Sequence, residues 1–339
     1  MSATPTRRMI GVMLLIPLIA AVALTAFAWP AARSAPHELP VGVAGPASAA
    51  APLQQGFERQ PDAFEVHRYD DEAAARAAIE ERDVYGAVVA TPEGPHLLTA
   101  SAAGPIVAQL LREAVTAQAP AGTEVPVTDV VATPSGDPRG SAFGASMLPL
   151  TLGGVATGAL VSLLALRGVR ALGTLFGAAA LAGLTATALA HGWLGVLAGD
   201  WWAEAGAFGL AVLAIGATVA GLASLIGPAG IGLGAFLMVL LGNPFSGVSS
   251  APEFLPEPFG ALGQLLPPGA SGSLLRSVAF FDGNAAATPV LTLTIWTVLG
   301  LAAVMAGTRR TSTAPGTPQS PESSEPDAPA RTKETAPAA

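Results

Sequence analysis

The sequence predicts an α-helical polytopic membrane protein, with six transmembrane helices and an inserted extracytoplasmic α/β domain. Of its 339 residues, 51% are hydrophobic and only 12% are charged, which is more apolar than an average globular protein. Residues 34–142, in contrast, have a strongly acidic composition that is typical of a water-soluble domain. Between Phe143 and Gly242 the only ionisable side chains other than histidine are Arg167, Arg170, Asp200 and Glu204. Each apolar stretch between these charges is long enough to cross a bilayer as a helix.

Residues 1–33 are predicted to form a cytoplasmic N-terminus and the first transmembrane helix. Arg7 and Arg8 precede an apolar run from Met9 to Trp29. A cleaved signal peptide has a shorter apolar core, followed by a small-residue site such as Ala26-Phe27-Ala28. The length of the run favours an uncleaved anchor, with a cleaved signal as the alternative.

Residues 34–142 alternate strand patterns with helix patterns. Strands are expected where apolar and β-branched residues alternate or cluster, and helices where alanine and leucine form an apolar stripe. Asp70 or Asp71 can cap the first of these helices. The expected strands are Leu39–Ala44, Phe64–Tyr69, Val84–Ala90, His96–Ala100 and Val125–Val131, and the expected helices are Ala74–Ile79 and Pro105–Gln118. We therefore expect a compact α/β domain with a sheet of three to five strands.

Residues 143–310 are predicted to contain five further transmembrane helices. Their expected ranges are Ala145–Leu166, Ala171–His191, Ala205–Ile226, Ala229–Leu241 and Ala287–Gly307. Cytoplasmic loops of membrane proteins carry an excess of arginine and lysine. With the N-terminus inside, the cytoplasmic segments hold the basic residues Arg7, Arg8, Arg167, Arg170, Arg309 and Arg310. This predicts a multi-pass membrane protein with both termini cytoplasmic and residues 34–142 outside.

The loop 243–286 is too apolar for an ordinary linker, and Pro and Gly divide it into short pieces. We expect short helices that lie in or dip into the outer leaflet against the bundle, with a plain surface loop as the alternative. The residues singled out in this re-entrant-like loop are Asn243, Pro244, Phe245, Gly247, Pro267, Pro268, Phe281 and Asp282. Residues 311–339 are rich in Pro, Ser, Thr, Ala and Glu and are predicted to be a disordered cytoplasmic tail.

Several functional classes are disfavoured by composition. The chain has no cysteine, and its single lysine, Lys333, lies in the tail, so a Walker A loop is absent. A formal net charge of −8 argues against nucleic-acid binding. His37, His67 and His96 lack close metal-ligand spacing, and no serine lies in a triad pattern. We therefore expect no enzyme, cofactor or metal site.

Three smaller features are interpreted structurally. Asp200 and Glu204 read as a solvated loop face, with cation binding as the alternative, and His191 reads as interfacial rather than as a proton relay. Arg276 and Asp282 flank the re-entrant-like loop and could pair or contact lipid headgroups, with a local structural role favoured. Small residues four apart are expected to pack within the bundle, and secondarily at a dimer face; these pairs are Gly154/Gly158, Gly173/Gly177, Gly195/Gly199 and Gly230/Gly234.

The order of one span, an α/β insertion and five more spans, with a Gly-Asn-Pro-Phe-Ser-Gly loop before the last span, resembles a known family. It is similar to actinobacterial membrane proteins grouped with type-2 ABC exporter permeases and the phage infection protein family. The likeness rests on Tyr69–Ala90, Asp137–Gly154 and Leu241–Gly283. The resemblance implies a homo- or heterodimer in contact with membrane lipids, and a separate cytoplasmic ATPase subunit.

Two functional hypotheses follow. The first is a permease-like subunit of an ABC exporter that moves a lipidic or amphipathic substrate. The second is a non-transporting envelope or secretion scaffold whose outer domain binds a partner protein. The second is retained because the N-terminal segment 1–8 and the Leu166–Ala171 connection are short for docking an ATPase.

Overall fold

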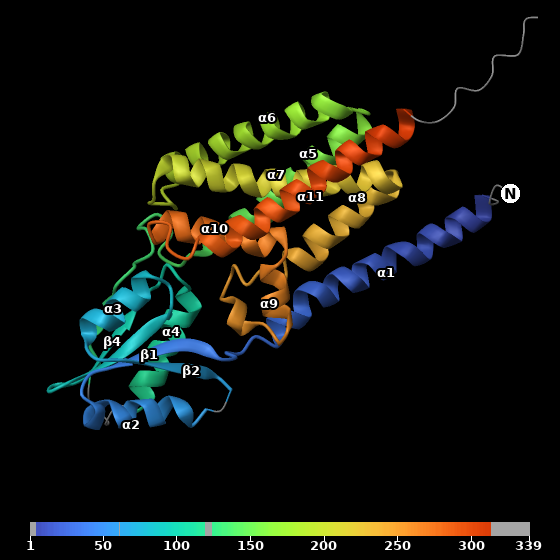
Figure 1. Cartoon of the computed structure of the whole chain (residues 1–339). Helices are drawn as coiled ribbons and strands as arrows, with labels where there is room; N and C mark the ends of the chain where they lie inside the picture. Colours follow the sequence, from blue (N-terminus) through green and yellow to red (C-terminus); the bar gives the residue numbers. More distant parts are fainter. Residues whose placement is uncertain (1–4, 61, 119–123, 313–339) are drawn as a thin grey trace, which may run out of the picture.

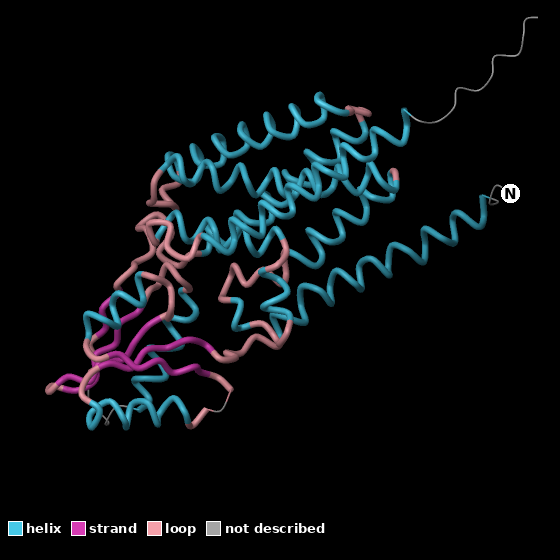
Figure 2. The backbone as a smooth tube through the Cα atoms, viewed as in Figure 1, coloured by secondary structure: helices cyan, strands magenta, loops and turns pink. Residues whose placement is uncertain are grey.

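The computed structural model describes residues 5–60, 62–118 and 124–312. An α/β domain sits at one end of a bundle of long helices (Figure 1). The chain enters this domain after the first helix and leaves it into the bundle (Figure 2). Most of the predicted disordered tail, from residue 313 onward, lies outside the described residues.

In its described residues the α/β domain contains five strands and three helices. In the sheet the strand order is β2-β1-β3-β4-β5, with β3 and β4 antiparallel and the other neighbouring pairs parallel. The elements are β1 (Leu39–Ala44), α2 (Ala47–Glu58), β2 (Phe64–Tyr69), α3 (Glu72–Glu80), β3 (Gly86–Thr91), β4 (Gly94–Thr99), α4 (Pro105–Gln118) and β5 (Val127–Asp129). The predicted small α/β domain is therefore present, with one helix, α2, that the sequence patterns did not predict.

Helices cover both faces of the sheet. Side chains alternate between the faces along each strand, so Val88 packs with α2 and α4 while Ala87 and Val89 pack with α3. The predicted cap of α3 is Asp71, whose Oδ1 accepts from the Ala74 amide at 2.8 Å. The sheet is thus covered on both faces, and the loops at its ends extend towards the bundle.

The bundle is built around helix α7 (Trp201–Ile226), which packs against most of its neighbours. In its most apolar window 67% of the residues are buried. The surrounding helices are α5 (Ser141–Leu163), α6 (Gly168–Thr187) with the π-helix η1 (Ala188–Trp193), α8 (Pro228–Ala235) with the π-helix η2 (Phe236–Gly242), and α11 (Ala287–Ser312). Helix α1 (Pro5–Ala32) runs apart from this core, and none of the residues in its most apolar window is buried (Figure 1).

Glycines bring some of these helices close together. A Cβ at Gly158 would lie 2.4 Å from the Gly216 carbonyl oxygen, and one at Gly154 would lie 2.7 Å from Ile215. Both contacts join α5 to α7, as expected for small residues at helix crossings. Packing within the bundle is wrong for Gly173 and Gly177, which have no heavy atom within 4 Å of such a Cβ in the described part of the chain.

Within the described part of the chain, five helices are long and apolar enough to cross a membrane, which supports a multi-pass membrane protein. Their candidate spans are Met9–Ala32, Ser141–Leu163, Gly168–Trp193, Trp201–Ile226 and Ala287–Gly307. The segment predicted as a span at Ala229–Leu241 forms a shorter apolar helix, Pro228–Gly242. Sequence therefore located all of the apolar helices, but one of them is shorter than a standard span.

Three segments that hold the predicted topology-setting arginines lie at the end of the bundle away from the α/β domain. These are the start of α1, the connection between α5 and α6, and the end of α11 (Figure 1). In the sequence Arg7 and Arg8 belong to the start of α1, and Arg309 and Arg310 to the end of α11. Arg167 and Arg170 flank the start of α6 and are exposed.

The start of α7 differs from the prediction. The helix begins at Trp201, and Asp200 caps it by accepting from the Ala203 amide. Glu204 is therefore in the first helical turn, where it is fully buried. Its carboxylate accepts from the Gly199 amide and lies 2.9 Å from Nδ1 of His191. The interpretation of Asp200 and Glu204 as one solvated loop face is wrong for Glu204, because the neighbouring helix covers it.

Candidate functional site

Residues 243–286 form an ordered unit between η2 and α11. It contains the 3-10 helix η3 (Pro252–Phe254), α9 (Phe259–Gln264) and α10 (Pro267–Phe280). Pro267 and Pro268 begin α10, where their ring geometry suits a first helical turn. Most of α10 is buried, and it packs against α7 and α11. Short helices were expected here, and the structure adds that α10 belongs to the protein interior.

The residues singled out in this loop lie in several places. Asn243, Pro244 and Gly247 line a hollow of about 220 Å³ beside the end of α1 and the start of α5. Phe245 stacks on the Phe259 ring at 4.9 Å. Phe281 is buried in the apolar cluster beneath α3. Asp282 is exposed and adopts a φ of 51°.

The α/β domain is joined directly to this unit. The backbone amides of Ala35 and His37 donate to the carbonyls of Phe254 and Glu253, at 3.2 Å and 2.8 Å. Phe254 and Ala251 belong to the same buried cluster as the strands β1 and β3. Because apolar packing and backbone hydrogen bonds both cross the junction, the domain and the unit 243–286 are held together rather than tethered by a linker.

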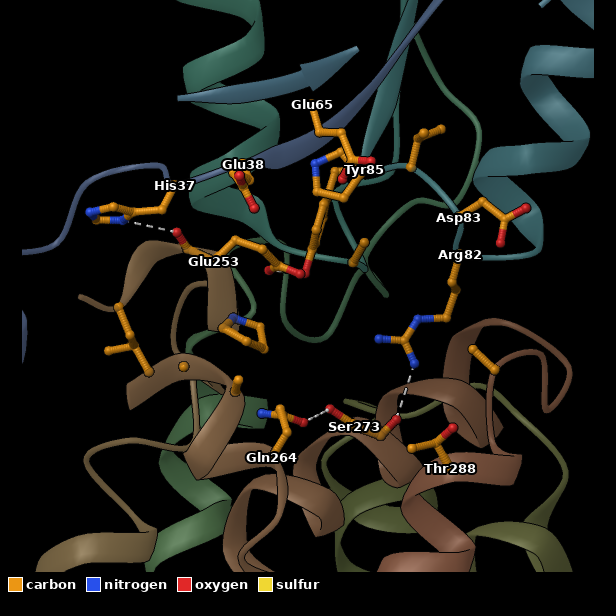
Figure 3. Close-up of a pocket in the computed structure, with 18 of the residues that line it drawn as sticks. His37, Glu38, Glu65, Arg82, Asp83, Tyr85, Glu253, Gln264, Ser273 and Thr288 are labelled. Carbon is orange, nitrogen blue, oxygen red and sulfur yellow. Dashed lines mark hydrogen bonds between the residues drawn. The ribbon is translucent and has the colours of Figure 1, made fainter. Parts of the chain in front are cut away.

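A cavity of about 720 Å³ lies at this junction. Its walls come from the start of β1, from β2, from the α3–β3 connection, from residues 252–264, from α10 and from the start of α11. Figure 3 shows Glu38 and Glu65 on the α/β domain side, and Gln264, Ser273 and Thr288 on the opposite side. A volume of this size matches small-molecule sites in proteins, which range from about 300 to 1,000 Å³.

A hydrogen bond links Tyr85 to Glu253 in the wall of the cavity. The Tyr85 hydroxyl donates to Oε2 of Glu253 at 2.8 Å (Figure 3). Burial and the nearby Glu253 carboxylate both raise the pKa of Tyr85, so the phenol stays protonated and able to donate. The contact joins the α/β domain to the unit 243–286 through a neutral donor and a charged acceptor.

Arg82 reaches across the cavity from the end of α3. The amides of Arg82 and Asp83 donate back to the carbonyls of Ile79 and Ala78, which is the Schellman ending of a helix. That ending needs a left-handed residue, usually glycine, and here Arg82 has a φ of 67°. A side chain in this conformation costs about 1–2 kcal/mol relative to glycine. The guanidinium of Arg82 lies at the cavity, as Figure 3 shows.

The Arg82 guanidinium is held on the membrane-helix side of the junction. Nη1 donates to the Ser273 carbonyl at 3.2 Å and to the Ser277 hydroxyl at 2.6 Å. Its Cζ atom lies 5.2 Å from the centre of the Phe281 ring. Burial lowers the pKa of Arg82, although Tyr85 and Glu253 partly oppose this. Part of its hydrogen-bonding capacity remains unused, because Nη2 and Nε have no partner among the described residues.

Arg276, on α10, is the second cation of the cavity and is only 4% exposed. Nη2 donates to the Val248 carbonyl at 2.9 Å, and Cζ lies 5.1 Å from the centre of the Phe143 ring. Its buried Nε has no hydrogen-bond partner among the described residues. Burial and the nearby Arg82 charge lower the pKa of Arg276 to about 10, so it is still protonated at neutral pH.

Neither cation forms an ion pair with a carboxylate within the described part of the chain. The suggested pairing of Arg276 with Asp282 is absent, because Arg276 is buried while Asp282 is exposed. Of the acidic residues around the cavity, Glu253 interacts electrostatically with both arginines. The site therefore combines two arginines that form no ion pair among the described residues with a wall that also carries carboxylates, of which Glu253 acts on both.

A metal site does not assemble from the three histidines of the α/β domain. His37 lies 3.3 Å from the Glu253 carbonyl, His67 beside Glu65, and His96 beside Thr128. In residues 5–60, 62–118 and 124–312 no group of three or more metal-ligating side chains is found.

Comparison of the chain with protein-family models, with curated proteins and with solved structures found no match in any of the three. The chemistry of the cavity is therefore the main guide to function. Its wall offers charged groups for a polar headgroup, and it lies where the α/β domain meets apolar helices. Such a site suits a molecule that has both a polar and an apolar part.

Sequence patterns did not single out Arg82, Tyr85 or Glu253. A signal was available at Arg82, since it follows a helix in the position where glycine is usual. Arg276 was noted only as a residue flanking the loop. Nothing local in the sequence indicates that these four side chains share one cavity.

Proposed function

We propose that this chain is a permease-like membrane subunit that moves a lipidic or amphipathic substrate. The observation that carries the proposal is the cavity of about 720 Å³ between the α/β domain and the unit 243–286. It would bind the polar part of the substrate at the membrane surface, while the apolar helices beside it would face the hydrocarbon part.

The proposed orientation has the α/β domain outside a bacterial plasma membrane and both termini in the cytoplasm. It is supported by the arginine-bearing segments at the opposite end of the bundle (Figure 1), because cytoplasmic loops are enriched in basic residues. In this arrangement the cavity lies at the outer leaflet, and His191 lies near the same surface.

The proposal includes a sixth crossing by α8 and η2. These elements contribute 8 and 7 residues, or about 22 Å at 1.5 Å per residue, against a hydrocarbon core of about 30 Å. A local thinning of the bilayer accommodates a short span at modest cost. The crossing is supported by the chain path, since α7 ends far from the α/β domain whereas α11 begins close to it.

Energy for transport would come from a separate cytoplasmic ATPase, because the chain contains no Walker A lysine. We further propose that two copies, or this chain and a related one, form a dimer. Exposed apolar residues along α1 leave room for such a contact within the membrane. The protein itself would catalyse no reaction.

A scaffold without transport activity is the second candidate. It is favoured by the small surface at the cytoplasmic end, where residues 164–167 connect α5 to α6 and Gly227 alone connects α7 to α8. In this case the α/β domain would bind an envelope or secretion partner.

The deciding experiment is purification of the tagged chain in a gentle detergent, scored for a co-purifying ATPase and for ATP hydrolysis. A stoichiometric ATPase would support the permease. Recovery of envelope or secretion proteins without an ATPase would contradict transport and support the scaffold.

A further inference from the structure

We propose that Arg82 and Arg276 form a binding site for the phosphate group of an amphipathic ligand. The inference rests on the proposed function, because it assigns a chemical class to the substrate of the cavity. A phosphate could belong to a phospholipid headgroup or to a soluble phosphate ester, and the two sources share the same chemistry at the arginines.

The first argument is the incomplete pairing of Arg276. A buried charge without an ion-pair partner is costly, so buried cations are normally paired or bind an anion. Arg276 is 4% exposed, and its Nε has no hydrogen-bond partner among the described residues. Its single hydrogen bond there goes to the neutral carbonyl of Val248. An anion at the cavity wall would supply the missing negative charge.

The second argument is the shared environment of the two arginines. Each guanidinium lies over a phenyl ring, Arg82 on Phe281 and Arg276 on Phe143. A ring covers one face of a guanidinium and leaves its N–H edge available, and this edge matches the oxygens of a phosphate. The charge of Arg82 also lowers the pKa of Arg276, so the two cations are close enough to repel each other. A shared anion would remove that repulsion.

The third argument is the conformation of Arg82. Arginine occupies a left-handed position, φ 67°, where glycine would be unstrained. Strain of this kind is often retained where a side chain has a specific task. Here the guanidinium of that side chain lies at the cavity (Figure 3).

Charge on the rest of the wall limits the ligand. Five acidic residues in the described part of the chain line the cavity: Glu38 and Glu65, which lie on the α/β domain side away from Arg82 (Figure 3), and Asp83, Glu253 and Glu257. They would repel a headgroup with several negative charges and would accept a cationic end. A zwitterionic headgroup, with one phosphate and one ammonium group, is therefore the best match to this wall.

The test uses the purified full-length chain in a maltoside detergent and native mass spectrometry with added phosphatidylcholine. The unsubstituted chain is expected to retain lipid, and Arg82→Gln and Arg276→Gln are each expected to weaken binding about tenfold or more, as for loss of a hydrogen bond to a charged group. Arg112→Gln is the matched control, because Arg112 is exposed on α4 and does not line the cavity.

A parallel arm identifies the source of the phosphate. Inorganic phosphate, compared with chloride at equal ionic strength, is scored by the rise it causes in the unfolding temperature. A rise that both Gln variants lose, together with lipid binding that they do not affect, would support the anion site with a soluble ligand. If the Gln variants change neither lipid binding nor the phosphate effect, the proposed site is wrong.

Folding defects are separated from binding defects by Arg82→Lys and Arg276→Lys, which keep the charge. These variants are expected to retain part of the binding that the Gln variants lose, because lysine keeps the charge but not the planar N–H edge of the guanidinium. Equal loss in the Lys and Gln variants, with normal unfolding temperatures, would contradict the charge-based argument. The outcome is independent of the ATPase experiment. If the chain co-purifies with an ATPase but binds no phosphate, the proposed phosphate site is wrong and the proposed function is still supported.

Discussion

Replacing Arg82 by alanine and by glycine separates the two roles of this residue at the junction. Both substitutions remove the hydrogen bonds to Ser273 and Ser277 and the contact with the Phe281 ring. They differ in the backbone, because Arg82 has a φ of 67° and glycine adopts that conformation without strain. We therefore expect both variants to be less stable than the natural chain, and the glycine variant to be the better of the two.

The magnitudes follow from the contacts. Hydrogen bonds from a charged donor contribute about 1.5–3 kcal/mol, and an arginine–phenyl contact adds about 0.5–1 kcal/mol. Arg82 is only partly buried, so solvent screening places the expected loss near the lower end, about 2 kcal/mol. Glycine avoids the strain of the left-handed conformation, which stabilises the glycine variant relative to alanine by about 1–2 kcal/mol. The greater conformational freedom of glycine in the unfolded chain lowers this advantage by about 0.4–1 kcal/mol. A net advantage of about 0.5–1 kcal/mol over alanine remains.

The assay is guanidinium unfolding of the full chain in detergent, followed by tryptophan fluorescence. Ala77→Gly is the matched control, since Ala77 is exposed in the middle of α3 and glycine there costs about 0.5–1 kcal/mol. Glycine should thus stabilise relative to alanine at position 82 and destabilise at position 77. The same sign at both positions would refute the conformational argument, and an alanine variant as stable as the natural chain would refute the contact argument.

Three further predictions concern other parts of the chain. Gly158→Ala should lower stability by about 1–2 kcal/mol in the same unfolding assay, because overpacking outweighs the gain in helix propensity, whereas Gly177→Ala should not lower it, since its Cβ meets open space. The raised pKa of Tyr85 means that its contribution to stability is complete below about pH 10, the usual tyrosine pKa, and is lost as pH rises further. The unfolding temperature of the natural chain should therefore fall more steeply across this alkaline range than that of Tyr85→Phe; parallel curves would contradict the assignment. On intact cells an impermeant thiol reagent should label Ser135→Cys but not Ala165→Cys, and the reverse pattern would overturn the proposed orientation.

Local patterns were sufficient for most individual elements. Strands β1 and β2 and helix α4 have the bounds that periodicity predicted, and Asp71 caps α3 as expected. The apolar helices were equally visible, because a segment buried in hydrocarbon needs a continuous apolar sequence. Helix α2 was missed, since Pro52 lies inside it and an internal proline is normally evidence against a helix.

These sequence patterns could not predict which polar side chains are buried. Glu204 and Asp200 are four residues apart and chemically alike, yet one is fully buried beside His191 and the other is exposed. The difference depends on which neighbouring helix covers each side chain. A single charge near the end of an apolar run carries no local signal of that packing.

By itself, the sequence determined the apolar helices, the presence of an α/β domain and the absence of a Walker A lysine, because each depends on local composition or spacing. Only the tertiary structure decided that Arg82 and Tyr85 meet Glu253 and Arg276 around one cavity. The first two of these residues are more than 150 positions from the other two in the chain. Their proximity results from packing of the sheet against η3 and α10, and long-range packing of this kind has no periodic signature in the sequence.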